Sequence, residues 1–302
     1  MLNIAILSRG AALYSTQHLY QAGIQRGHSV QIVDYQRCTI GVERQRLTIR
    51  QAGHPLPSYD VILPRIGVSH TEHGARLLRH FEMQGIHTLV PSEGLRNARD
   101  KFHCHQLLAA AGIPVPNTFM AGAPEDLPDL LDQFDDRPVV LKLVESTHGI
   151  GVLLAPDRFS ALAMAETFSK LEQPILVQEF IPESGGCDIR AFVVGARVVA
   201  AIRRCAMPGE FRANLHRGAT AEPVRLTREE TKIALHSART VGLPVAGVDL
   251  LRTSRGPLVV EVNASPGLQG IETATGINVS DAILTYLEKK LQSRTLLVAG
   301  AG

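Results

Sequence analysis

Nearly continuous apolar runs alternate with amphipathic segments along the first hundred residues. Such runs are typical of strands that are buried on both faces. They lie at 2–7 (LNIAIL), 29–34 (SVQIVD) and 59–67 (YDVILPRIG). A helical pattern covers 14–26 and ends before Gly27, and RLTIR at 46–50 fits part of a small hairpin. Strands that alternate with helices predict a parallel sheet with helices on its faces. We therefore expect a first domain over residues 1–97.

The pattern changes after this point. Helical periodicity covers 98–111, where AGIPVP ends it, and returns over 156–171 and 227–241. The third helix begins with a capping box formed by Thr227 and Glu230. Apolar strands surround these helices, at 138–144, 151–155, 174–180, 188–195, 197–203, 245–251 and 257–263. Several of them are close enough in sequence to form hairpins, which predicts mixed or antiparallel sheets and an α+β character.

Two of these strands bring acidic side chains together. The sequence AGVDLLRTSRGPLVVEVN has a turn signal at 254–256, between two apolar strands. A hairpin centred near Arg255 places Asp249 opposite Glu261, and Asn263 shares the face of Glu261. Opposed carboxylates repel, and a divalent cation with oxygen ligands removes that cost, as Mg²⁺ or Mn²⁺ does. The alternative is a solvent-facing sheet surface with ordinary acidic residues.

A lysine and a glycine-containing loop supply a complementary charge. In RPVVLKLVESTHGIGVLLA, Lys142 lies in an apolar strand, and the loop from Glu145 to Gly151 leads straight into the next strand. Backbone N–H groups of such a loop approach an anion closely, and the lysine adds a positive charge. The chain has no Walker A motif and no G-x-G-x-x-G after its first strand. These absences disfavour a P-loop NTPase and a conventional NAD-binding enzyme, and an ordinary hairpin is the alternative for the loop.

A basic stretch lies between these two regions, in IRRCAMPGEFRANLHRGA at 202–219. Its arginines match phosphate and carboxylate oxygens, which indicates a local anion site, although a solvated loop is the alternative. The whole chain of 302 residues carries a net charge of only +2, from 31 basic and 29 acidic residues. That balance gives no support for general binding to nucleic acids or membranes.

The remaining titratable residues point to few further sites. Four cysteines occur, none of them in a C-x-x-C pair, so the sequence suggests neither a zinc site nor a disulfide framework, and it favours a reducing cytoplasm. The histidine pairs His70/His73 and His103/His105 lack acidic partners, and we expect them at the surface. No signal peptide is recognisable at the start, and no stretch is apolar over the length that spans a bilayer.

Together these motifs resemble those of the RimK-type α-L-glutamate ligases of the ATP-grasp superfamily. The resemblance runs through nearly the whole chain, and it is most specific in VVLKLVESTHGIGV, CDIRAFVVG, FRANLHRGA, AGVDLLR and EVNASPG. It implies an α/β and α+β multidomain fold: an N-terminal Rossmann-like parallel-sheet domain, then a two-lobed ATP-grasp fold. The small lobe with the glycine-rich loop would span 98–177, and the large lobe with the metal site 178–302.

The resemblance also implies roles for individual residues. ATP would be bound by Lys101, Lys142, the loop residues Glu145, Ser146, Gly149 and Gly151, the adenine hinge Glu179–Phe180, the acid Asp188, and Arg212, Ala213 and Asn214. Asp249, Glu261 and Asn263 match the ligands of Mg²⁺ or Mn²⁺, with two ions expected, and these are the three residues that strand geometry selects. Arg203, Arg204 or Arg212 would steady the charge on the transferring phosphoryl group. Replacing Asp249 or Glu261 by alanine is expected to abolish turnover without unfolding the protein.

The activity implied is an ATP-dependent ligation of L-glutamate to the C-terminal glutamate of a protein or peptide, such as a small-subunit ribosomal protein. Arg65 would either bind a carboxylate in the interdomain cleft or be a solvated strand-end residue. Alternative functions are a ligase for another acceptor or amino acid, such as a lysine-biosynthesis carrier protein or a cofactor, and a non-catalytic nucleotide-binding regulator. We expect a cytoplasmic homo-oligomer that binds neither membranes nor nucleic acids.

Overall fold

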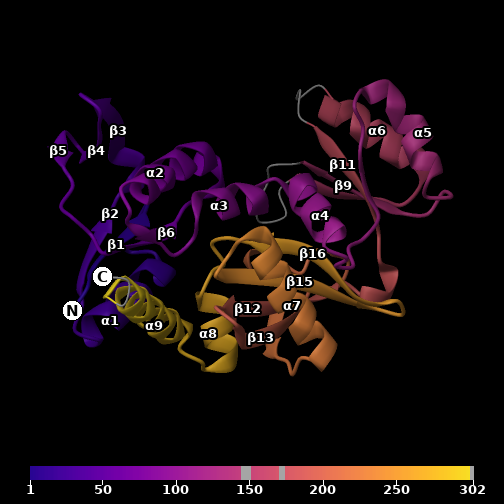
Figure 1. Cartoon of the computed structure of the whole chain (residues 1–302). Coiled ribbons are helices and arrows are strands. Elements are labelled where there is room, and N and C mark those ends of the chain that lie inside the picture. The colour runs from indigo at the N-terminus through magenta and orange to yellow at the C-terminus, as the bar shows by residue number, and fades with distance from the viewer. Residues whose placement is uncertain (144–150, 170–173, 300–302) are drawn as a thin grey trace.

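The part of the chain that the structure describes forms four β-sheets with helices around them (Figure 1). The computed structural model describes residues 1–143, 151–169 and 174–299. An N-terminal parallel sheet lies at one end, a small antiparallel sheet at the other, and a larger antiparallel sheet between and below them (Figure 1). This mixture of parallel and antiparallel sheets agrees with the α/β and α+β fold expected from the sequence.

The N-terminal sheet has the strand order β2-β1-β6-β7, and all its pairings are parallel. Its strands are β1 (Asn3–Ser8), β2 (Ser29–Val33), β6 (Val61–Arg65) and β7 (His87–Thr88). Helices α1 (Tyr14–Gln25), α2 (Thr71–Met83) and α3 (Ser92–Arg99) accompany it. The expected hairpin is also present, in a separate antiparallel sheet of β3 (Cys38–Glu43), β4 (Arg46–Gln51) and β5 (His54–Pro55).

The small lobe is a second antiparallel sheet, with the strand order β10-β9-β11-β8. It consists of β8 (Thr118–Met120), β9 (Val139–Leu143), β10 (Val152–Ala155) and β11 (Ile175–Glu179). Helices α5 (Leu127–Asp132) and α6 (Arg158–Ser169) pack on this sheet and share its apolar core. The division that we predicted between 177 and 178 falls inside β11, so the polypeptide leaves this lobe slightly later.

The large lobe has the strand order β14-β13-β12-β15-β16, and its pairings are antiparallel. Its strands are β12 (Cys187–Val194), β13 (Arg197–Cys205), β14 (Thr220–Pro223), β15 (Val245–Thr253) and β16 (Gly256–Asn263). Its helices are α7 (Arg228–Val241), α8 (Gln269–Thr275) and α9 (Val279–Ala299). Helix α4 (Lys101–Ala110), which lies within the predicted small lobe, contacts α7 and β16 of the large lobe as well as β8 of the small lobe. Short 3₁₀ segments occur at Tyr35–Arg37, Val68–His70, Pro124–Asp126, Pro182–Ser184 and Leu215–Arg217.

Local signals explain where several helices begin and end. Thr227 accepts from the Glu230 backbone N–H, and the Glu230 carboxylate accepts from the Thr227 N–H, which confirms the predicted capping box of α7. Asp100 interrupts the helix expected over 98–111: its extended backbone ends α3, and its side chain accepts from His103 N–H to begin α4. The side chains that precede and follow this break, Arg99 and Lys101, are thereby set on two different helices.

The C-terminal helix returns to the N-terminal domain. α9 lies beside α1 (Figure 1), and Arg26 on the α1 side bonds Glu288 through Nε at 2.9 Å and Asp281 through Nη1 at 2.6 Å. Leu19 and Ala22 share one apolar core with Ile283, Leu284 and Leu287. The first and last parts of the described chain therefore stabilise each other.

Two cysteines correct an expectation from the sequence. Cys187 and Cys205 face each other at the end of the β12–β13 pair and form a disulfide, although we expected no disulfide framework. Their separation of 18 residues gave no signal, because only the strand register brings them together. Cys38 and Cys104 are free and buried. Among the described residues, no helix is long and apolar enough to cross a membrane.

Candidate active site

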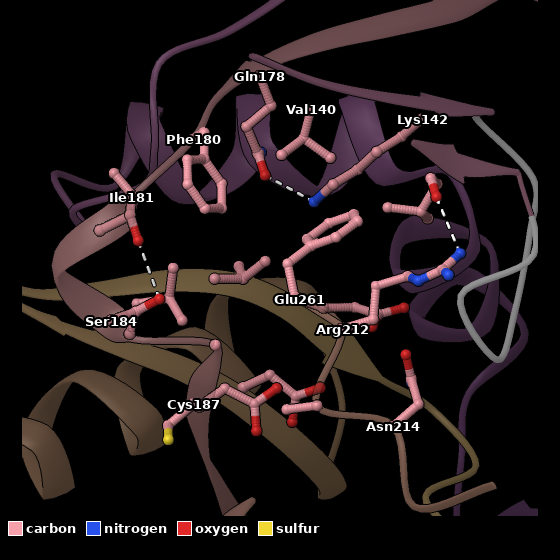
Figure 2. A pocket seen from close by; sticks show the side chains of 18 of the residues that line it. Val140, Lys142, Gln178, Phe180, Ile181, Ser184, Cys187, Arg212, Asn214 and Glu261 are labelled. Atoms are coloured by element: carbon pink, nitrogen blue, oxygen red, sulfur yellow. Dashed lines mark hydrogen bonds between the residues drawn. The ribbon is translucent and has the colours of Figure 1, made fainter. Parts of the chain in front are cut away.

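A cavity lies between the small lobe and the large antiparallel sheet (Figure 2). Val140 and Lys142 contribute from β9, and Glu179 and Phe180 from the segment that joins the lobes. Asp249 and Glu261 contribute from β15 and β16, and Lys101 from the start of α4. Most residues selected from the sequence therefore meet in one place, although they come from three regions of the chain.

A chain of hydrogen bonds orients Lys142. Its Nζ donates to Gln178 Oε1 at 2.6 Å, and Gln178 Nε2 donates to Thr118 Oγ1 at 2.7 Å (Figure 2 shows the first bond). Thr118 Oγ1 lies 3.1 Å from His105 Nδ1, and His105 Nε2–H donates to the Val260 carbonyl at 2.9 Å. Gln178 is only 4% exposed, so the small lobe holds this lysine in one direction.

Burial changes the charges along this chain. Desolvation lowers the pKa of Lys142 to about 8, an effect that Glu261 opposes and Lys101 reinforces. Desolvation also lowers the pKa of His105 to about 4, so the imidazole is neutral at pH 7. His105 is 6% exposed, which corrects the expectation that it lies at the surface. A partly desolvated ammonium such as Lys142 gains strongly from binding an anion.

The predicted glycine-rich loop is described only at its end. Glu145, Ser146 and Gly149 lie outside the described residues, and Gly151 opens the return towards β10. Gly151 has φ +67°, and a Cβ atom there would lie 2.6 Å from Leu143 Cδ1. Both observations explain why glycine is needed at this position.

The hinge between the lobes carries Glu179, Phe180 and Ile181, all of which line the cavity. The Glu179 N–H donates to the Asn117 carbonyl at 2.9 Å, and the Phe180 N–H donates to the Pro138 carbonyl at 3.3 Å. The backbone N–H groups of Glu179 and Phe180, expected to bind adenine, thus already donate to carbonyls of the small lobe. Ile181, which sequence reasoning did not select, is the next backbone position along the same wall (Figure 2).

Two carboxylates and two arginines form a buried network on the large sheet. Arg190 donates to both oxygens of Asp249, at 2.7 and 2.6 Å, and Arg204 donates to both oxygens of Asp188, at 2.7 and 2.6 Å. Arg204 Nη2 also lies 3.1 Å from Asp249 Oδ2, which links the two pairs. The strand registers bring these partners together, because Asp188 lies opposite Arg204 and Arg190 lies opposite Asp249 on neighbouring strands.

The charges of this network are mutually dependent. Burial would raise the pKa of Asp249, but the guanidinium groups of Arg190 and Arg204 outweigh it and hold that pKa below its usual value. Burial raises the pKa of Asp188 to about 6, because the attraction of Arg204 is partly cancelled by the charge of Asp249. Arg204 is 3% exposed and already neutralised by two carboxylates, so the network holds its guanidinium in place.

Asp249 lies opposite Glu261, as predicted from the sequence, and Gly247 lies opposite Asn263. The turn pairs Thr253 with Gly256, and a register shift between Asp249 and Leu250 brings the two carboxylates opposite each other. Among the described residues, Glu261 has no hydrogen bond or ion pair, and it lines the main cavity and a smaller adjoining one. Asn263 lines the smaller cavity, and its Nδ2 donates to Asp249 Oδ2 at 3.3 Å. An unpaired carboxylate beside an amide is a donor set that suits Mg²⁺ or Mn²⁺.

Asp249 fits a metal less simply, because it also accepts from two arginines. A carboxylate has about four lone-pair sites, so a position on Oδ1 is left beside the bond from Arg190. The described ranges contain no group of three or more His, Cys, Asp or Glu side chains that could hold a metal ion, so the candidate set includes the amide of Asn263. The residues fit a divalent ion held by Glu261 and Asn263, with one oxygen from Asp249.

The basic stretch divides between the cavity and the surface. Arg212 donates to the Val152 carbonyl at 3.1 Å across the lobes and pairs with Glu210 at 2.6 Å, while Ala213 and Asn214 also line the cavity (Figure 2). Arg203, predicted to be catalytic, does not line the cavity. It is exposed on the opposite face of β13 from Arg204 and lies 3.4 Å from Glu222. Strand alternation explains the difference.

Comparisons of the sequence with known families identify this arrangement. Residues 98–287 match the model of the RimK-like ATP-grasp domain, and residues 2–95 match the RimK PreATP-grasp domain. The chain belongs to the RimK-like ATP-grasp family. As a member of this family, it is an ATP-dependent ligase.

Related proteins and structures agree with this assignment. The chain is 49% identical over 301 residues to "Probable alpha-L-glutamate ligase 2" of Shewanella denitrificans, with 100% of both chains covered. It is 50% identical over 290 residues to "Probable alpha-L-glutamate ligase" of Trichodesmium erythraeum, covering 96% of this chain and 97% of that one.

Two solved structures share the fold of this RimK-like protein. A RimK domain ATP-grasp protein from Sphaerobacter thermophilus superposes with a TM-score of 0.75 at 23% identity, covering 94% of this chain and 98% of that one. D-alanine–D-alanine ligase from Bacillus anthracis, complexed with ATP, superposes with a TM-score of 0.70 at 19% identity, covering 98% of this chain and 99% of that one. At these identities the likeness concerns the fold.

Proposed function

We propose that this protein is an α-L-glutamate ligase that uses ATP to add L-glutamate to the C-terminal glutamate of a protein or peptide. The observation that carries the proposal is the meeting of Lys101 and Lys142 with Glu261 and Asp249 in one interlobe cavity. The near 50% identity to proteins named probable alpha-L-glutamate ligases, over almost their whole length, supports glutamate as the amino acid.

The proposed reaction has two steps. An oxygen of the acceptor carboxylate attacks the γ-phosphorus of ATP, the bond to the bridging oxygen breaks, and an acyl phosphate and ADP are formed. The amino group of glutamate then attacks the acyl carbon, loses a proton, and expels inorganic phosphate as the amide bond forms. Phosphoryl transfer needs alignment and charge neutralisation more than a protein nucleophile, which is consistent with the side chains in the cavity.

The side chains of the cavity have distinct proposed roles. Lys142 and Lys101 neutralise phosphate oxygens, and the bond from Lys142 to Gln178 fixes the direction of the first ammonium. Phe180 and Ile181 provide an apolar wall and backbone polar groups for adenine. Arg212, which already bridges the lobes through Val152, steadies charge on the transferring group. Arg204 instead holds Asp188 and Asp249 in position.

Glu261 and Asn263, with an oxygen of Asp249, would hold divalent metal ions, Mg²⁺ or Mn²⁺ and two in number. When bound, such ions neutralise charge on the β- and γ-phosphate oxygens. The acceptor is proposed to be a small-subunit ribosomal protein, since a RimK-type ligase modifies such a C-terminus. A C-terminal peptide of that kind is the first acceptor to test.

The test is incubation of the full chain with ATP, MgCl₂, L-glutamate and a peptide ending in glutamate. Mass spectrometry should detect successive glutamyl additions, and ADP should form in the same amount as amide bonds. Lys142→Met should lower the rate by about 100-fold or more, since a preorganised charge at the transferring group is lost. Lys232→Met, an exposed lysine of α7, is the matched control and should leave the rate unchanged.

Three results would contradict parts of this proposal. Incorporation of another amino acid alone would refute glutamate but leave the ligase class intact. Addition to a carrier protein or a cofactor, and not to a peptide, would refute the acceptor. Binding of ATP without turnover, over the range of acceptors and amino acids tested, would favour a nucleotide-binding regulator.

A further inference from the structure

Two arginines of the N-terminal domain, Arg65 and Arg99, lie where this domain meets the large lobe. Arg65 is the last residue of β6, and Arg99 is the last residue of α3. Arg65 Nη2 donates to the Pro266 carbonyl at 2.8 Å, and Arg99 Nη2 donates to the Ile66 carbonyl at 2.6 Å. Arg65 is therefore not the solvated strand-end residue that the sequence left open, because it contacts the loop after β16.

Neither guanidinium has a carboxylate partner. In the described part of the chain, the ion pairs include neither Arg65 nor Arg99, and Arg99 Nε is buried without a hydrogen-bond acceptor. Among the residues that the structure describes, both donate to backbone carbonyls alone, although each guanidinium has five N–H donors. Arg190 and Arg204, by contrast, are each matched with a carboxylate. Arg65 and Arg99 are thus two partly buried cations that have no anionic partner among the described residues.

The electrostatics agree with this geometry. Burial lowers the pKa of Arg65 to about 10, and repulsion from Arg99 acts in the same direction. Burial also lowers the pKa of Arg99, while the charge of Glu261 opposes that effect. Glu261 is the nearby carboxylate, and it is also the residue that we expect to bind metal. A second anion in this position would therefore be attracted by both arginines.

One member of the pair, Arg99, lines a cavity next to the main one, whereas Arg65 lines neither of these two cavities. The smaller cavity is lined by Arg99 and Lys101 together with Glu261 and Asn263. Glu261 also lines the main cavity, so the two spaces meet at this carboxylate. An anion bound by Arg99 in the smaller cavity would lie beside Glu261, which also lines the main cavity.

We propose that Arg65 and Arg99 form a clamp for a substrate carboxylate that is not activated. This inference rests on the proposed function, in which only one carboxylate reacts. Glutamate brings two carboxylates that must stay unreacted, and the last residue of the acceptor brings another on its side chain. Guanidinium groups match the planar carboxylate with paired hydrogen bonds, and a clamp would keep these groups away from the transferring phosphoryl group.

The test compares substrates with and without each carboxylate. Steady-state kinetics would use wild type, Arg65→Met, Arg99→Met and the control Arg76→Met, whose side chain is exposed on α2. One arm varies the amino acid: L-glutamate, glutamine and isoglutamine. The other arm varies the last residue of the acceptor peptide, glutamate against glutamine. Circular dichroism of each variant reports folding.

We expect kcat/KM for one substrate to fall by about 10- to 100-fold in Arg65→Met and Arg99→Met, mainly through KM, since charge-assisted hydrogen bonds are lost. The analogue that lacks the clamped carboxylate should react equally well with wild type and both variants. If the variants are impaired only with the carboxylate form of the amino acid, the clamp binds the amino acid. If they are impaired only with the carboxylate form of the peptide, the clamp binds the acceptor. Arg76→Met should match wild type in both arms.

Two outcomes would overturn the clamp. One is an equal loss for carboxylates and carboxamides, which indicates a structural role for the arginines. The other is a wild type that does not distinguish them in either arm. If wild type forms no amide at all, the proposed function fails separately. The clamp is then decided by calorimetric titration of L-glutamate and of the peptide, where equal affinity of wild type and variants overturns it.

Discussion

Replacement of Asp249 by alanine should destabilise the fold as well as stop turnover. The sequence predicted loss of activity alone, but Asp249 is 4% exposed and accepts from Arg190 at 2.7 and 2.6 Å and from Arg204 at 3.1 Å. Without it, Arg190 loses its carboxylate and Arg204 keeps only Asp188. Breaking a buried ion pair by removing one partner costs about 3–5 kcal/mol of unfolding free energy.

This cost corresponds to a measurable change in melting temperature. At about 2.1 cal/mol/K per residue, the 302-residue chain has an unfolding entropy of about 0.6 kcal/mol/K. The melting temperature of Asp249→Ala should therefore fall by about 5–8 °C. The variant remains folded at 25 °C because domains of this kind are stable by about 5–15 kcal/mol.

Glu261→Ala is the matched control for this prediction. Glu261 lies opposite Asp249 but has no ion pair with a described residue, so its loss should cost about 1 kcal/mol or less. Both variants should lack ligase activity if both side chains bind metal. Thermal unfolding followed by circular dichroism, without nucleotide or metal, measures the difference. Equal melting temperatures for the two variants would refute the structural role assigned to Asp249.

Two further predictions concern other parts of the fold. His105 has a pKa of about 4 in the folded protein, below its ordinary value of 6.5. The folded protein therefore binds fewer protons than the unfolded chain between these pH values. The contribution of this residue to the free energy of unfolding is fully present above pH 6.5 and falls by about 3 kcal/mol as the pH drops to 4. Urea unfolding at pH 7 and 4.5 checks this, and the loss should be smaller in His105→Gln; the same pH dependence in both proteins would contradict it. Gly94→Ala should lower stability by about 1–3 kcal/mol, because the new Cβ would lie 2.6 Å from the Gly242 carbonyl oxygen, whereas Gly267→Ala meets no atom within 4 Å and should be neutral in the same thermal assay.

Much of the fold followed from local patterns. The buried runs of the N-terminal sheet and the capping box at Thr227 depend on short-range signals, which are apolar periodicity and one cap. The pairing of Asp249 with Glu261 was predicted correctly, but it also depends on a register shift between Asp249 and Leu250 that the turn does not signal. α9 was not predicted, although it is long. Its partners on α1 lie more than 250 residues away, and only the assembled structure explains which face it buries.

The candidate site was predictable as a set of residue types but not as a set of contacts. The resemblance implied Arg203, Arg204 or Arg212 as a charge-stabilising group, yet the bonds of Arg204 to Asp188 and Asp249 make it part of a buried network. Gln178 and His105 were missed because their role depends on the bonds that link Lys142 to Val260 across two lobes. The bond from Arg65 to the Pro266 carbonyl likewise depends on the contact between the N-terminal domain and the loop after β16.

The contact between α1 and α9 has a consequence for synthesis of the chain. Arg26 emerges early, but its partners Asp281 and Glu288 are added only near the end of translation. Until then, Leu19 and Ala22 have no cover from Ile283 and Leu287, so the nascent N-terminal domain exposes an apolar strip. Early termination before residue 279 would leave that strip open permanently, and such fragments should aggregate or depend on chaperones.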